Sequence, residues 1–277
     1  MKALKYIALS LLPLALLLAV LIWSFFASLT PRERAEFWFV QQKGYPQGSA
    51  AEQWRLERAI RADSSFAPAF MEKSVSHNKR GQFAVGFALL DHAVEIDPVE
   101  YLGYRGFVKL YMLRDYEGAL RDFERLDSLT PGVRDAPWGE DIYYVLGLAC
   151  KQRGDWERAL HYFSRSIEET TREQGEDWVE VRNFWYRALV RLALGDPEGA
   201  LADLDTALRL FPRFTEAHFW RGKVLAELER SEEACAAAAG ALELFAAGQY
   251  YSDKYYELPD QLYRSDIETF LQELSCR

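Results

Sequence analysis

The sequence lacks the residue groupings on which most catalytic and metal sites depend. Its 277 residues contain no G-x-x-x-x-G-K-[ST] phosphate loop, no G-x-S-x-G elbow, no H-E-x-x-H motif and no C-x-x-C pair. Histidine is scarce, and its four copies lie far apart without ligand spacing, at His77, His92, His161 and His218. We therefore expect neither an enzyme nor a bound cofactor or metal ion.

Cysteine is equally scarce, and its three copies do not make a disulfide framework. Cys150 and Cys235 fall in segments with a helical pattern, where a buried structural thiol is the expected state. Cys276 stands beside the last residue, so we expect it to face solvent. A reactive or pairing role for Cys276 is the alternative.

The sequence also lacks an excess of positive charge. The formal net charge is −9, and residues 1–32 contain Lys2, Lys5 and Arg32 but no acidic residue. Removing these three from the 33 basic residues leaves 30 against 42 acidic residues in the rest of the chain. Such a body repels phosphate backbones, so we do not expect nucleic-acid binding.

What the sequence does contain is a recurring unit, most complete in residues 179–214. Counted from Val181, the landmarks at positions 4, 8, 15, 16, 20, 24, 27 and 32 are Phe184, Ala188, Gly195, Asp196, Ala200, Leu204, Ala207 and Pro212. The three alanines would let two antiparallel helices approach closely, while Phe184 and Leu204 fill the space between them. Gly195-Asp196 would break the first helix, and Pro212 would stop the second.

This pattern resembles the tetratricopeptide repeat, a 34-residue helix-turn-helix unit that stacks into α-solenoids. The departures are Arg187, where the family usually has leucine, and Pro197, where it has an aromatic residue. Proline is tolerated in the first turn of a helix because its missing N–H would lack a partner there. Since one helix pair cannot bury its apolar face alone, the resemblance requires neighbouring copies.

Such copies are present on both sides. The strongest match begins at Glu140 and carries Tyr143, Leu146, Gly147, Gly154, Asp155, Trp156, Ala159, Phe163 and Ser166. Others begin at Ala67, at about Glu100 with one extra residue in the first helix, and at Thr215, and a degenerate first copy keeps Leu56 and Ala59. We therefore predict an all-α fold, an α-solenoid of about six helix-turn-helix units at 33–66, 67–99, 100–133, 140–173, 181–214 and 215–248.

Two linkers exceed the repeat period, at 134–139 and 174–180, and each carries a tryptophan, Trp138 or Trp178. Insertions emerge on the edges of a stacked array and are often used for binding. The alternative is that each indole folds back over a helix end.

The N-terminal segment predicts a single membrane-spanning helix after a short basic tail, 1–5. Residues 6–29 contain no charge and exceed the roughly 20 apolar residues that cross a hydrocarbon core. A cleaved signal peptide is the alternative, but the apolar run is long and lacks a small-x-small cleavage site. The basic tail favours a signal anchor with its N-terminus in the cytoplasm, which places the repeats on the non-cytoplasmic side, in the periplasm of a two-membrane bacterium.

The C-terminal segment, 249–277, is expected to be a tyrosine-rich linker followed by a capping helix. Ser265 and Glu268 have the spacing of a capping box. Ile267, Phe270, Leu271 and Leu274 form one apolar stripe, which would cover the exposed face of the last repeat. The preceding tyrosines, at 250, 251, 255, 256 and 263, would pack on this helix or present an adhesive surface.

The family resemblance implies a concave surface lined by the first helix of each unit. The central positions of that surface carry large apolar side chains: Met71, Tyr104, Tyr144, Trp185 and Phe219. Lys151, Arg182 and Lys223 are nearby cations that could receive carboxylates. These eight residues are the candidate partner-binding groove for an extended peptide or a helix; packing between repeats is the alternative role of the aromatic row.

The function predicted from these features is a membrane-anchored scaffold for protein-protein interaction, docking a membrane or envelope protein through its concave face. One alternative is an accessory subunit of a membrane complex, held there by its transmembrane helix. Another is a secreted or periplasmic peptide carrier, released by cleavage of the N-terminal segment. Self-association into a homo-oligomer is compatible with each.

Overall fold

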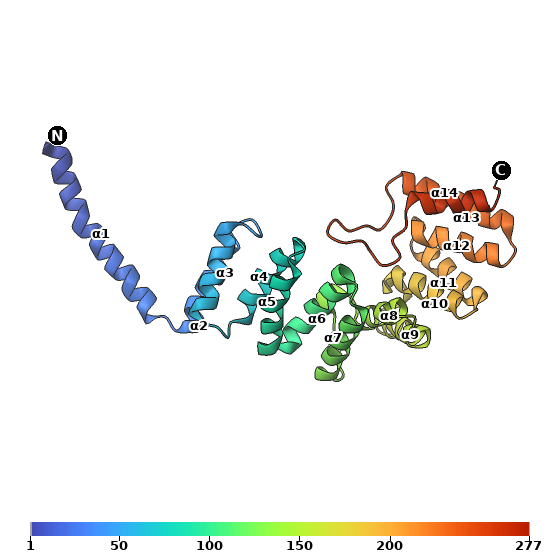
Figure 1. Ribbon diagram of the computed structural model, residues 1–277, viewed down its shortest axis with the longest axis horizontal. Coiled ribbons are helices and arrows are strands. Elements are labelled where there is room, and N and C mark those ends of the chain that lie inside the picture. Colours follow the sequence, from blue (N-terminus) through green and yellow to red (C-terminus); the bar gives the residue numbers. More distant parts are fainter. Residues whose placement is uncertain (1, 277) are drawn as a thin grey trace. The chain divides into compact units, whose positions relative to one another are not determined.

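The computed structural model describes residues 2–276, with the side chains of residues 13 and 16–276. The described residues form helices and no strand. They divide into two compact units, residues 1–101 and 102–277. The first unit holds α1 (Lys2–Ser28), α2 (Pro31–Gln42), α3 (Ala50–Ala62), α4 (Ala67–Lys79) and α5 (Phe83–Ile96), and Figure 1 labels each of them. The side chains of the predicted basic tail, 1–5, and of most of the first half of the predicted span are not among those described.

The second unit contains the longer run of helix pairs. Its elements are α6 (Pro98–Phe107), which begins in the first unit, η1 (Val108–Leu113), α7 (Tyr116–Leu129), η2 (Pro137–Gly139), α8 (Ile142–Gln152), α9 (Trp156–Glu173), η3 (Glu176–Trp178), α10 (Val181–Ala193), α11 (Pro197–Leu210), α12 (Thr215–Glu227), α13 (Ser231–Ala246) and α14 (Arg264–Glu273). Consecutive helices pack as antiparallel pairs, and the all-α repeat architecture predicted from the sequence is confirmed.

Small residues set the distance between paired helices. A Cβ added at Gly147 in α8 would lie 3.0 Å from the ring of Phe163 in α9, closer than ordinary packing, so the glycine lets this phenyl ring lie directly against the opposite backbone. Ala200, Leu204 and Ala207 of α11 are fully buried in the same way. Close packing of this kind gives each pair its apolar core, as the repeat pattern predicts.

The turns between paired helices need a left-handed residue. Gly154 and Gly195 adopt φ values of +76° and +79° at this point, a conformation that costs glycine little. Asp196 then caps α11, because its side chain accepts a hydrogen bond from Gly199 N at 2.9 Å. The predicted break at Gly195-Asp196 is therefore confirmed.

The extra residue predicted in the third repeat, at 100–133, has a structural counterpart. Residues Val108–Leu113 form a π-helix, η1, which continues α6. A π-helix takes up one more residue per turn than an α-helix, so an insertion can be absorbed without breaking the helix. Arg114 ends this element in the left-handed conformation, with φ of 55°, before Asp115 caps α7.

Arg187, the departure from the leucine typical of the family, forms a buried ion pair across its helix pair. Its Nε and Nη2 lie 2.9 and 2.6 Å from the two carboxylate oxygens of Asp203 in α11. Arg191 approaches the same carboxylate at 3.3 Å. In the third repeat, Arg105 binds Asp122 with the same bidentate geometry, at 2.9 and 2.7 Å. The arginine is thus compensated by an aspartate on the second helix.

The last helix, α14, covers the final repeat as predicted. Ile267 and Phe270 are buried against Phe219 of α12 and Ala238 of α13, and Leu271 and Leu274 pack at the edge of this cluster. The capping box expected at Ser265 is wrong. The helix begins two residues earlier, with Tyr263 as its N-cap, and the Asp266 carboxylate accepts from the backbone N–H of Tyr263 at 2.9 Å.

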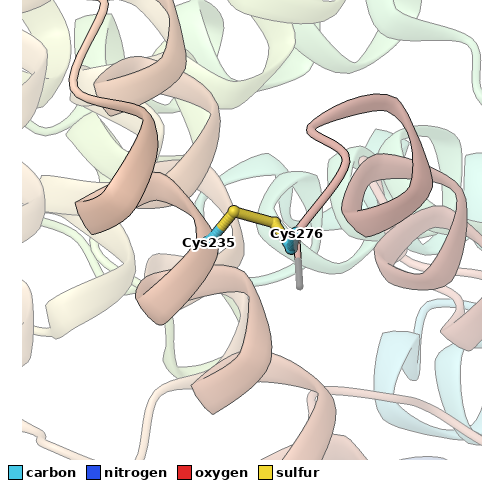
Figure 2. Close-up of a disulfide and its surroundings, with 2 residues drawn as sticks. All are labelled: Cys235 and Cys276. Carbon is cyan, nitrogen blue, oxygen red and sulfur yellow. A yellow bond between two sulfur atoms is a disulfide. The ribbon is translucent and has the colours of Figure 1, made fainter.

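A disulfide fastens the end of the chain to the last helix pair. Figure 2 shows Cys235, on α13, bonded to Cys276, which follows α14, with Cα atoms 5.6 Å apart. The expectation of a buried thiol at Cys235 is wrong, and for Cys276 the alternative, a pairing role, is the one observed. The fold of α14 onto α13 brings these residues, 41 apart in sequence, into contact. Cys150 is buried and free, as expected.

Replacement of Cys276 by serine is expected to lower the free energy of unfolding by about 2–4 kcal/mol, the usual contribution of a disulfide closing a loop of this length. Urea unfolding followed by circular dichroism measures it. A reductant should produce the same loss in the natural chain and no further loss in the variant. Cys150→Ser serves as control, and a reductant effect that vanished in this control would contradict the assignment.

In the part of α1 whose side chains are described, exposed apolar side chains lie on all sides of the helix. Its described residues include Leu16, Ile22 and Trp23, with relative exposures of 60, 51 and 71%. Among the residues described in full, no single helix has the length and hydropathy needed to cross a membrane. One pair, Leu16–Ser28 with Pro31–Gln42, meets those criteria jointly but is bent by 116°.

Candidate protein-interaction groove

The predicted aromatic row is part of the packed interior. Tyr104, Tyr144, Trp185 and Phe219 are all buried. Trp185 stacks on Tyr186 at 4.3 Å between ring centroids, and Tyr104 lies 4.4 Å from Trp138. The fifth residue, Met71, is half-buried in α4 of the first unit. The four aromatic rings therefore pack between helices of this chain and are not exposed for contact with a partner.

The three predicted cations already have partners within the chain. Lys151 Nζ lies 2.8 Å from both carboxylate oxygens of Asp260. Arg182 pairs with Glu140 at 3.1 Å and with Glu180 at 3.2 Å. Lys223 Nζ lies 4.4 Å from the centre of the Phe270 ring. Lys151 and Lys223 therefore contact the C-terminal segment, 249–277. The sequence predicts that this segment caps the last repeat, but the contact with Lys151 reaches an earlier one.

Residues 249–263, here called the C-terminal loop, extend from the last repeat back along the first helices. Figure 1 shows this loop as the brown coil between α13 and α14. We use "groove" for the surface of η1, α8, α10 and α12 that the loop contacts. The loop thus covers first helices of the repeats, the elements that the sequence predicts to line the partner-binding surface.

The near end of the loop binds α12 through its backbone. Tyr251 N donates a 2.8 Å hydrogen bond to Glu216 Oε1, and Gln249 O accepts one from Thr215 Oγ1. The Tyr251 ring packs edge-on against Phe214 at 5.4 Å. Gln261 Nε2 closes the base of the loop with a 2.8 Å bond to Tyr251 O.

The far end of the loop reaches η1, α8 and α10. The Tyr256 ring lies 5.2 Å from Tyr111 and 5.8 Å from Phe107. Tyr186 donates its hydroxyl to Pro259 O at 2.9 Å. Asp260 is held by Lys151 and also accepts from Gln152 Nε2 at 2.7 Å. For Tyr251 and Tyr256 the expectation of packing on the capping helix is wrong, because both rings pack on earlier repeats.

Burial determines the protonation of the groove side chains. It raises the pKa of Tyr186 and of Tyr111 well above the usual value for tyrosine. Both hydroxyls therefore remain neutral donors, Tyr186 to the loop and Tyr111 to Glu140 Oε2 at 2.5 Å. Burial also raises the pKa of the Glu216 carboxyl, whose Oε2 is buried without a hydrogen-bond partner.

Replacement of Glu216 by glutamine is expected to stabilise the protein at neutral pH. A carboxyl whose pKa is higher in the folded than in the unfolded state loses stability as pH rises from its ordinary value of 4.5 through the folded value. Glutamine keeps an acceptor for Tyr251 N without the buried charge. Urea unfolding between pH 4 and 8 should show a gain for the variant at pH 7 that disappears near pH 4. A gain independent of pH would contradict the explanation.

The two long linkers line one polar cavity of about 380 Å³ together with α9 and α10. Arg134 spans it, donating to Asp141 and to Thr170 Oγ1. Trp138 folds back on Tyr104 and Phe107, which is the covering role expected for it. Trp178 is 72% exposed, so its indole covers no helix end.

Comparison with known proteins supports this architecture. Residues 187–250 match the family model of the tetratricopeptide repeat, over the helix pairs from α10 to α13. The fold is of the tetratricopeptide-repeat type. No curated protein sequence matches the chain closely enough to count as a relative.

Solved structures show the same repeat fold at low identity. The APC/C hetero-tetramer Cut9-Hcn1 aligns with a TM-score of 0.60 and 14% identity over 87% of this chain, which spans 43% of that chain. PilW, described as a widely conserved type IV pilus biogenesis factor, aligns at 0.60 and 14% over 79% of this chain and 95% of its own. YrrB, described as a tetratricopeptide-repeat protein with an unusual peptide-binding site, aligns at 0.52 and 19% over 68% and 91%.

Proposed function

We propose that this protein is a membrane-anchored scaffold that docks a protein partner in the groove of its second unit. Proteins with this fold generally act through protein-protein interaction rather than catalysis. The observation that carries the proposal is the C-terminal loop itself. The groove already holds a non-helical segment through an ion pair between Lys151 and Asp260, a hydrogen bond to a main-chain carbonyl and ring packing, which are contacts of the kind that recognise a peptide.

The membrane anchor is supported by the surface of α1. A helix that exposes apolar side chains on every side is stable only in apolar surroundings. Aromatic rings continue from its end into α2 and α3, since Phe26 packs on Phe37 at 4.9 Å and Trp38 packs on Trp54 at 5.2 Å. Aromatic side chains at the end of a span are typical of the membrane-water interface.

A non-cytoplasmic position of the repeats is supported by the Cys235–Cys276 disulfide. Disulfides persist in oxidising compartments and are rare in the cytosol. This agrees with the orientation proposed for the N-terminal segment, with its basic tail in the cytoplasm. The partner would then be an envelope or membrane protein with a segment exposed on the same side.

The experiment is affinity purification of the full chain from native membranes in mild detergent, with cross-linking and mass spectrometry. A chain beginning at Thr30 is purified in parallel. The proposal expects a stoichiometric partner with both chains, cross-linked to residues of α8 or α10. A partner seen only with the full chain would contradict groove docking and favour a subunit held by its transmembrane helix.

Intact mass of the mature protein tests the anchor separately. The full mass is expected. Loss of about 28 residues, the length of a cleavable signal sequence, would contradict the anchor and favour a released carrier.

A further inference from the structure

The C-terminal loop occupies the groove with a defined pattern of side chains. Tyr256 packs on Phe107 and Tyr111, and Asp260, four residues later, is bound by Lys151 and Gln152. Between them, Pro259 is buried and its carbonyl accepts from Tyr186. An aromatic ring, a main-chain carbonyl and a carboxylate of the loop thus contact three elements: the ring packs on the end of α6 and on η1, the carbonyl binds α10 and the carboxylate binds α8.

The carboxylate position is the most selective of the three. The Lys151 side chain is only 8% exposed when the loop is in place. Any segment that covers the same surface must supply a carboxylate there, or it leaves a buried cation without a counter-charge, which is strongly unfavourable. Apolar or basic segments are therefore rejected even where their shape would fit.

The loop is held at its two ends and much less between them. Ser252, Asp253 and Lys254 are exposed, and Asp253 accepts only from the backbone of Tyr255 within the loop. Segments with few buried contacts open locally at a small cost in free energy. This exposed stretch gives the loop slack, so that its release breaks the contacts of residues 256–260 and leaves α13, α14 and the disulfide in place.

We propose that the C-terminal loop is a built-in competitor for the groove. The partner it excludes is an acidic segment of another protein, in which an aromatic residue is followed four residues later by a carboxylate at a turn. This inference rests on the proposed function and specifies its ligand. Because the loop is tethered, its effective concentration at the groove is on the order of millimolar, and an external segment binds with an affinity reduced by the fraction of molecules in which the loop is closed.

The test uses the full chain in detergent and a fluorescent peptide of residues 249–263 with blocked ends. Asp260→Asn removes the loop carboxylate and suits the left-handed backbone of this residue, whose φ is 56°. Fluorescence anisotropy should show the peptide binding at least tenfold more tightly to Asp260→Asn than to the natural chain. A peptide that itself carries asparagine at this position should not bind.

Two further variants keep the result interpretable. Asp253→Asn changes the same charge in the exposed part of the loop and should bind the peptide as weakly as the natural chain. Lys151→Ala, combined with Asp260→Asn, should abolish the gain. Circular dichroism of each variant confirms that the fold is intact, and titration of free thiols, which should find Cys150 alone, confirms the disulfide.

Equal binding to the natural chain and to Asp260→Asn, or an equal gain from Asp253→Asn, would overturn the inference. So would a dimer of the natural chain dissociated by the peptide, since the loop would then belong to the groove of a second copy. The proposed function would survive these results if the purified partner still cross-linked to α8 or α10. If, in addition, no partner cross-linked to α8 or α10, the proposed function would be contradicted together with the inference.

Discussion

Replacement of Phe163 by alanine is expected to lower the free energy of unfolding by about 3–5 kcal/mol, the usual cost of removing a buried phenylalanine. Phe163 is fully buried in α9 and stacks on Tyr186 at 5.9 Å. Its ring also lies 6.1 Å from Tyr144 and fills the space that Gly147 leaves open. Chemical denaturation of the purified chain measures the loss.

The same substitution should weaken the groove, because Tyr186 supports the C-terminal loop from α10. Hydrogen exchange of residues 249–263 is expected to rise in Phe163→Ala. Phe211→Ala is the matched control, since this ring is 40% exposed and its removal should cost less than about 1 kcal/mol. A loss of similar size for both variants would contradict the packing described for α8 and α9.

Replacement of Arg187 by leucine, the residue typical of the family at this position, is expected to destabilise the protein by roughly 3 kcal/mol. The substitution leaves the Asp203 carboxylate, only 6% exposed, without its bidentate partner. Breaking a buried ion pair on one side costs about 3–5 kcal/mol. The lower end applies because Arg191 remains 3.3 Å from the carboxylate.

The second substitution, Asp203→Ala, should then recover at least half of that loss. Removing both members of a buried ion pair leaves no uncompensated charge, so the apolar pair is often as stable as the original. A double-mutant cycle by urea denaturation measures the coupling. Additive losses in the double variant would show that Arg187 and Asp203 do not act as a pair.

The repeat architecture could be predicted because its determinants are local. Small residues at helix contacts, a glycine at the turn and an aspartate after it recur at fixed spacing, and Gly147, Gly195 and Asp196 perform the expected roles. Even the irregular third unit was marked in the sequence by its extra residue, which becomes the π-helix at Val108–Leu113. Each of these features involves residues within one or two units.

The candidate groove was harder to predict because its contacts join distant parts of the chain. Lys151 and Asp260 are 109 residues apart, and nothing in their spacing within the repeat indicates that they meet. The same holds for Cys235 and Cys276, which only the fold of α14 brings together. The available signal was compositional: Tyr251, Tyr256 and Asp260 lie in an acidic, aromatic segment that has no helical period.

Position in the repeat does not predict whether the aromatic row is buried or exposed. A large ring on the first helix of a repeat can either face a partner or pack on the next repeat, and both roles favour the same residue types. Tyr144 and Trp185 lie inward against Tyr186, so the groove that the loop covers is formed instead by the hydroxyl of Tyr186 and the charged end of Lys151.

The most direct measurement is site-specific photo-cross-linking in native membranes, with a photoreactive residue in place of Gln152 beside Lys151. A second variant carries it at Arg121, a residue of α7 whose side chain is 64% exposed. Our account predicts that position 152 cross-links to a partner protein and that an excess of the 249–263 peptide suppresses this product. A partner captured equally from position 121, or from position 152 without competition by the peptide, would contradict it.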